Sequence, residues 1–146
     1  MSVEDQHYYR LFDHTADLGM EIFGDDAPGL FVNAGKALFH VMVSAGQHEP
    51  RETHRQQLSM EGYDWADLMV NWLRELLYLW HGRQQIPVQI HIEALVETHL
   101  TANIVTCSFL PSVDIVQKEI KAATYHQITV APQADGRWRA RVVFDV

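Results

Sequence analysis

The sequence predicts an α+β fold, in which a mostly antiparallel β-sheet packs with two main amphipathic helices in a single compact domain, 1–146. Two segments place apolar residues at helical spacing, and several others alternate apolar and polar residues with a period of two. The helical segments do not alternate regularly with the strand-like ones, which favours antiparallel pairing. A length of 146 residues and a hydrophobic content of 47% suffice for one domain with its own core.

Two strand-like segments, 8–12 and 18–23, open the chain around the stretch FDHTADLG. The residues from Gly24 to Pro28 then end the alternation and offer a helix start, because a first turn tolerates proline. Apolar residues at four-residue spacing predict an amphipathic helix over 27–45; they are Leu30, Ala34, Leu38 and Met42.

A polar loop, 46–54, and an alternating strand, 55–60, follow the first helix. Asp64 is expected to cap a second helix over 64–82, with Gly82 as its terminator. The apolar residues of this helix form a stripe wide enough to be largely buried; they are Leu68, Met69, Trp72, Leu73, Leu76, Leu77 and Trp80.

The last third of the chain changes to a period of two. Strands are expected over 88–96, 100–109, 120–130 and 138–146. The dipeptide Asp135-Gly136 lies between the last two segments and is a hairpin turn signal. The expected element order is therefore β-β-α-β-α-β-β-β-β.

The charge balance is acidic, with 11 Lys and Arg against 19 Asp and Glu, for a formal net charge of −8. Phosphate contacts need Lys and Arg, so little or no direct nucleic-acid binding by the chain alone is expected. An acidic field suits a basic protein partner or a divalent cation. Neither a signal peptide nor an apolar stretch of about 20 residues is evident, so we expect a cytoplasmic protein that does not enter the membrane.

Cys107 is the only cysteine, which excludes an internal disulfide and a thiolate zinc site. Its apolar surroundings predict a buried structural thiol. The nine histidines form no HExxH arrangement, and the chain contains neither a glycine-rich phosphate loop nor a GxSxG motif. The sequence therefore offers no recognisable machinery for nucleotide hydrolysis or acyl transfer.

Asp13, His14 and Asp17 bring two carboxylates and an imidazole between two strand-like segments. They could be metal ligands or an acid–base group in a strand-to-strand loop. They could equally be turn-forming residues, because Asp side chains accept backbone N–H bonds in Asx-turns. The short motif leaves both interpretations open.

The apolar terminal segment VVFDV places Asp145 beside the last residue, Val146. Alternation puts Val143 and Asp145 on one face of a strand, and Phe144 and Val146 on the other. A docked terminal strand would fix the Asp145 carboxylate and the terminal carboxylate of Val146, and such hard oxygen ligands suit Ca²⁺ or Mg²⁺. The alternative is that Asp145 simply faces solvent.

A third group of charged residues lies in the segment KEIKAATYH, 118–126. Strand alternation would place Glu119, Lys121, Ala123 and Tyr125 on one face. Lys121 could reach a carboxylate or a phosphate, or it could be an ordinary solvated side chain.

Four segments, taken in order, resemble the archease family. They are FDHTADLG at 12–19, NWLRELLY at 71–78, EIKAATYH at 119–126 and FDV at 144–146. Each block alone is modest evidence, but four in family order over the whole length are specific. The segments 46–54 and 110–117 match no family motif.

The resemblance implies a protein cofactor, not an enzyme, that promotes guanylylation and multiple turnover of an RtcB-type RNA ligase in tRNA splicing and RNA repair. It implies a divalent metal, Ca²⁺ with Mg²⁺ as the alternative, held by Asp17, Asp145 and an oxygen of Val146. Lys121 matches a lysine needed for activation, and Asp13 and His14 match motif positions around the metal. Two other functions stay open: a small metal-dependent hydrolase using the Asp13–Asp17 loop, and a chaperone for tRNA-modifying enzymes.

Overall fold

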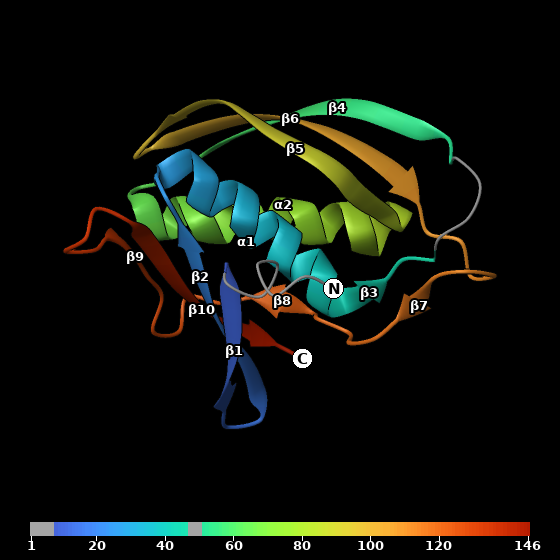
Figure 1. Ribbon diagram of the computed structural model, residues 1–146, viewed down its shortest axis with the longest axis horizontal. Helices are drawn as coiled ribbons and strands as arrows, with labels where there is room; N and C mark the ends of the chain where they lie inside the picture. Colours follow the sequence, from blue (N-terminus) through green and yellow to red (C-terminus); the bar gives the residue numbers. More distant parts are fainter. Residues whose placement is uncertain (1–7, 47–50) are drawn as a thin grey trace.

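The computed structural model describes residues 8–46 and 51–146, and it has three layers with both helices between two sheets (Figure 1). The helices are α1 (Ala27–Met42) and α2 (Trp65–Arg83). The five-stranded sheet contains β1 (Tyr9–His14), β2 (Asp17–Gly24), β8 (Ala122–Ala123), β9 (Thr129–Pro132) and β10 (Trp138–Asp145). The three-stranded sheet contains β4 (Thr53–Glu61), β5 (Gln85–Val96) and β6 (His99–Ser108), and β3 (Val43–Ser44) pairs separately with β7 (Ile115–Val116). All strand pairs are antiparallel, so the predicted α+β class is confirmed.

Helix α1 begins where the sequence predicts and ends earlier. The Asp26 side chain caps it by accepting a hydrogen bond from the Gly29 N–H at 2.7 Å. The helix ends at Met42, not at 45, because Val43 adopts extended backbone and pairs with Val116. Of the predicted polar loop, residues 47–50 lie outside the described residues.

Helix α2 has the predicted cap but a different end. The Asp64 carboxylate accepts from the Asp67 N–H at 2.8 Å. The helix continues through Gly82 to Arg83, and Gln84 takes the left-handed conformation with φ 51° in place of the expected glycine. Its Trp72 is fully buried and donates its indole N–H to the Phe31 carbonyl at 2.8 Å, which ties the two helices together.

The five-stranded sheet has the order β1-β2-β10-β8, and β9 also pairs with β10. Its inner face packs on the helices through fully buried side chains on β2 and β10; they are Met20, Ile22, Ala140, Val142 and Phe144. Such burial of apolar surface contributes roughly 25 cal/mol per Å² to folding. The turn at Asp135-Gly136 is confirmed: Gly136 has φ 87° and its N–H donates to the Gln133 carbonyl at 3.0 Å.

The expectation of one continuous strand over 120–130 is wrong. Only Ala122 and Ala123 pair as β8, and β9 starts at Thr129. Ile120 and Ala123 are both fully buried although they are three residues apart, which breaks the two-residue alternation. A turn with Gln127 at φ 53° then redirects the chain. The predicted grouping of Glu119, Lys121, Ala123 and Tyr125 on one strand face therefore fails.

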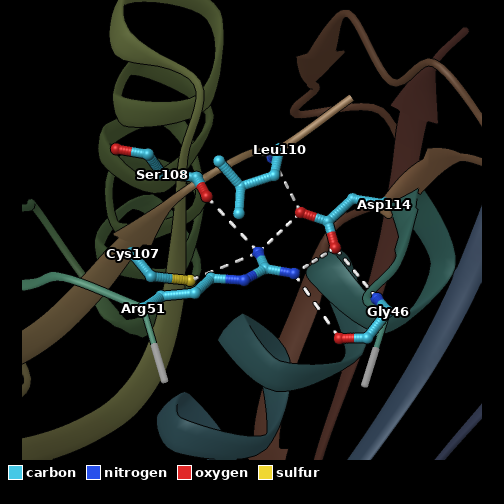
Figure 2. Close-up of polar contacts among 6 residues, drawn as sticks. All are labelled: Gly46, Arg51, Cys107, Ser108, Leu110 and Asp114. Atoms are coloured by element: carbon cyan, nitrogen blue, oxygen red, sulfur yellow. Dashed lines mark hydrogen bonds and ion pairs between the residues drawn. The ribbon is translucent and has the colours of Figure 1, made fainter. Parts of the chain in front are cut away.

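A buried ion pair joins the segment before β4 to the segment after β6 (Figure 2). The Arg51 Nη1 donates to Asp114 Oδ2 at 2.5 Å, and the Asp114 side chain is fully buried. The same carboxylate accepts from the backbone N–H groups of Gly46 at 2.9 Å and Leu110 at 2.8 Å. These bonds, the one from Arg51 foremost, hold the pKa of Asp114 well below its usual range.

The buried state predicted for Cys107 is confirmed, and its sulfur lies 3.8 Å from Arg51 Nη1. Within residues 8–46 and 51–146, no helix is both long enough and apolar enough to cross a membrane.

Candidate functional site

The stretch FDHTADLG forms a β-hairpin with a tight turn. His14 pairs with Asp17 as the last register pair, which leaves only Thr15 and Ala16 in the turn. Ala16 has φ 59°, a conformation in which a residue with a Cβ costs about 1–3 kcal/mol. Asp13 and His14 therefore belong to β1, not to a loop, and Asp17 starts β2 (Figure 1).

The end of β10 brings Asp145 to this hairpin. The register of β10 with β2 runs to the pair Phe144 and Leu18, so the next step along both strands places Asp145 opposite Asp17. On its other side Asp145 pairs with Ala122 of β8, and its carbonyl accepts the Lys121 N–H at 2.8 Å. Three segments far apart in sequence therefore meet where the sheet ends.

Strand alternation decides which of the predicted residues share a face. Antiparallel partners point to the same side, so His14, Asp17 and Asp145 all lie on the outer face of the sheet. Asp13 pairs with Leu18 and points to the opposite face, where it is exposed. The structure thus brings together three of the predicted site residues and separates Asp13 from them.

His14 carries a buried polar atom without a hydrogen bond at this site. Its Nδ1 is buried without a hydrogen-bond partner and lies 3.6 Å from Asp17 Oδ2. The ring also stacks edge-to-face on His126, with centroids 5.0 Å apart. His126 is the last residue of the segment EIKAATYH, and it lies here because the chain turns at Gln127, which strand alternation does not predict.

Lys121 is exposed on a segment that the surrounding structure fixes in place. Ile120 before it and Ala123 after it are fully buried. The Thr124 N–H and hydroxyl both donate to the Val143 carbonyl, at 3.1 and 2.8 Å. The Lys121 side chain therefore extends from a backbone segment that is fixed in place beside the end of β10.

Helix α2 holds the same segment through Tyr125. The Tyr125 hydroxyl donates to Asp67 Oδ1 at 2.6 Å, and the Arg74 guanidinium lies 4.8 Å from the centre of the Tyr125 ring. The Arg74 Nε also donates to the Ala123 carbonyl at 3.3 Å. The bond between Tyr125 and Asp67 lowers the pKa of the carboxyl and raises the pKa of the phenol. Sequence reasoning missed Asp67, because an acidic residue in a first helical turn is also an ordinary capping residue.

The residues at the site are compatible with a hard divalent cation. Among the described residues, no group of three or more His, Cys, Asp and Glu side chains is arranged to hold a metal ion. The expected ligand set contains only two such side chains, Asp17 and Asp145, and takes its third oxygen from Val146. The two carboxylates on neighbouring strands are oxygen donors of the kind that Ca²⁺ and Mg²⁺ accept, whereas the His14 imidazole beside them is a ligand that softer metals prefer.

Fold and site together define a small three-layer α+β protein with a carboxylate site at the end of its larger sheet. The chain matches the model of the Archease protein family (MTH1598/TM1083) over residues 9–146. The chain belongs to this family.

Relatives and a solved structure agree with this assignment. The chain is similar to the protein archease of Methanosarcina acetivorans, with 32% identity over 94% of this chain and 95% of the relative. It is also similar to the protein archease of Pyrococcus abyssi, with 31% identity over 92% and 96%. The solution structure of Methanobacterium thermoautotrophicum protein 1598 superimposes with a TM-score of 0.73 and 29% identity, over 95% of this chain and 99% of that one.

Proposed function

We propose that this protein is a cofactor of an RtcB-type RNA ligase, whose guanylylation and multiple turnover it promotes in tRNA splicing or RNA repair in the cytoplasm. The observation that carries the proposal is the meeting of Asp17, Asp145 and Lys121 at the end of one sheet. These are the positions at which the resemblance to the family implies a metal site and an activating lysine.

The chemistry of these side chains suits a role at the active site of another protein. Asp145 and Lys121 are exposed, and His14 and Asp17 are partly exposed. A divalent cation, when bound, would supply the positive charge that allows Asp17, Asp145 and an oxygen of Val146 to lie close together. The Lys121 ammonium would contact a phosphate or an acidic group of the ligase.

Removing either carboxylate should weaken metal binding without unfolding the chain. Asp17→Asn and Asp145→Asn keep the side-chain shape but remove a charged oxygen ligand, so affinity for Ca²⁺ should fall by at least about tenfold. Calorimetric titration with Ca²⁺ and with Mg²⁺ measures this. Asp25→Asn is the control, because the Asp25 side chain is 98% exposed and lies at the opposite end of β2. Unchanged affinity in both site variants would remove the metal from the proposal.

Residues added after Val146 should also weaken calcium binding. An appended tag converts the terminal carboxylate into an amide, which removes one negative charge beside Asp145. The same tag placed before Met1 is the matched control. A loss of calcium affinity confined to the C-terminal tag is expected, and equal affinity of the two tagged forms would show that Val146 provides no ligand.

The proposed activity is tested by RNA joining. Small amounts of this protein should allow a cognate ligase to complete many rounds of joining, and the protein alone should join no RNA. If ligase turnover stays unchanged, and the protein instead hydrolyses phosphate esters or prevents aggregation of a tRNA-modifying enzyme, the hydrolase or the chaperone function replaces the proposal.

A further inference from the structure

A row of arginines occupies the outer face of the five-stranded sheet, next to the candidate site. Arg139 and Arg141 of β10 point outward, because their neighbours Ala140 and Val142 are fully buried in the core. Arg137 lies two residues before Arg139, which places it on the same face. Arg10 of β1 also lies on this face, because Arg10 and Arg141 are both register partners of Glu21. We call these four residues, Arg10, Arg137, Arg139 and Arg141, the arginine row.

Aromatic rings lie beneath two of these guanidinium groups. The Arg141 guanidinium is 4.0 Å from the centre of the Phe12 ring, and the Arg137 guanidinium is 5.9 Å from the centre of the Phe23 ring. The Phe12 ring in turn rests on Gly19, where a Cβ would come within 2.1 Å of a ring atom. The rings therefore lie within cation–π distance of the two guanidinium groups, and the Arg137 and Arg141 side chains are exposed and partly exposed.

The neighbours of β10 leave this face open. On one side, the register partners of Arg139 and Arg141 on β9 are the small residues Ala131 and Thr129. On the other side, Glu21 is almost fully buried and bonds to Arg10 at 2.7 Å and to Arg139 at 3.4 Å. The side chains of Arg10, Arg137 and Arg139 remain 69%, 51% and 40% exposed.

The arginine row concentrates positive charge locally on an acidic chain. The arginine row holds four of the 11 basic residues, whereas the chain carries a formal charge of −8. The arginine row and its ion-pair partners Glu21 and Asp25 together keep two formal positive charges, whereas Asp17 and Asp145 bring two negative charges to the end of the same face. A local cationic surface on an acidic protein selects an anionic partner at that surface and repels anions elsewhere.

We infer that the arginine row binds the phosphodiester backbone of a single-stranded nucleic acid. Alternate residues of a strand stand about 6.6–6.8 Å apart, so Arg137, Arg139 and Arg141 form a regular line of cations. Phosphates along a nucleic-acid strand are regularly repeated anions, and the planar guanidinium fork matches them. Carboxylates present such a repeat only where acidic residues alternate along an extended chain, whereas every single-stranded nucleic acid presents it. The same strand face continues to the buried Val143 and the Asp145 carboxylate, which offer a phosphate no cation, so the expected contact is confined to the arginine row.

The inference depends on the residues of this face and not on the proposed function. It is tested by fluorescence anisotropy with a labelled single strand of about 12 nucleotides, as RNA and as DNA, over a salt series. Three phosphate contacts predict a slope of about −2 for log K against log salt, and dissociation constants of about 10⁻⁶ to 10⁻⁴ M. RNA and DNA should bind alike, because the contacts are to the backbone.

Substitutions then assign the binding to the row. Arg139→Gln with Arg141→Gln should weaken binding about tenfold or more and reduce the slope to about −0.7. Arg137→Gln alone should also weaken oligonucleotide binding. This substitution should leave the fold intact, because the ion pair of Arg137 with Asp25 is exposed. Arg55→Gln is the control, since Arg55 is an exposed arginine on β4 of the other sheet. Thermal midpoints recorded on each variant confirm that the fold is kept.

Three results would overturn the inference. One is failure of the strand to bind at low salt, and another is equal binding by the wild type and the arginine variants. The third is tighter binding of poly-glutamate than of the oligonucleotide, which would assign the face to an acidic protein. Guanylate transfer to the ligase without RNA should be unaffected by the arginine variants, so failure of the inference and failure of the proposed function are told apart.

Discussion

Lys121→Ala is expected to abolish the stimulation of ligase guanylylation while the fold stays intact. Lys121 is exposed, and its segment is held by Ile120, Ala123 and Thr124, so truncating its side chain removes no buried contact. The loss would come from the missing ammonium at the contact with a phosphate or an acidic group of the ligase. Transfer of labelled guanylate to the ligase measures the effect, with urea unfolding as the check on stability.

The matched control is Lys118→Ala, because Lys118 is an exposed lysine three residues upstream on the same segment. It should keep the stimulation of the wild type. Equal losses in both variants would mean that the overall charge of the segment matters and not the position of Lys121. Full stimulation of guanylylation by Lys121→Ala would show that Lys121 is not needed for activation.

Asp114→Ala is expected to give the largest loss of stability, about 3–5 kcal/mol of unfolding free energy, because it leaves the Arg51 guanidinium without its ion-pair partner. The Arg51 side chain is only 12% exposed, so water replaces little of the lost interaction. Urea denaturation measures the change. The double variant Arg51→Met with Asp114→Leu should be less destabilised than Asp114→Ala, because it removes both charges at once. An equal or greater loss in the double variant would contradict this explanation.

The same pair predicts the direction of the acid response. The pKa of Asp114 is lowered in the folded protein, so its stabilisation is complete above the pKa of an unfolded Asp, about 3.9. It is lost as the pH falls from there toward the lower folded pKa. The difference in unfolding free energy between wild type and Asp114→Ala should therefore shrink below about pH 4. A difference that stays constant into acid would show that Asp114 contributes through packing alone.

The sequence predicted the helices and most strands because their periodicity is strong. The Asp26 and Asp64 caps have a local cause, and both carboxylates accept the expected N–H bonds. The failures lie where tertiary contacts override local pattern. Val43 leaves the helix to pair with Val116, and 120–130 bends because Ile120 and Ala123 both enter the core. Neither cause is visible in a window of neighbouring residues.

The candidate site could also be predicted only in part, because its geometry depends on tertiary contacts. Asp17 and Asp145 followed from two short motifs, but their approach depends on the β2–β10 register, which pairs residues 114 to 126 positions apart. The separation of Asp13 from Asp17 follows from the two-residue turn, which converts an expected loop into strand ends. The net charge of −8 describes the whole chain and conceals the arginine row, which exists only once β10 is paired.

Guanylate transfer tests the central claim most directly. A cognate RtcB-type ligase is incubated with labelled GTP, with and without this protein and in the absence of RNA. The account predicts a clear rise in labelled ligase with the wild type, and none with Lys121→Ala. Equal labelling of the ligase with the wild type and with no added protein would contradict the proposal that this chain is an activator.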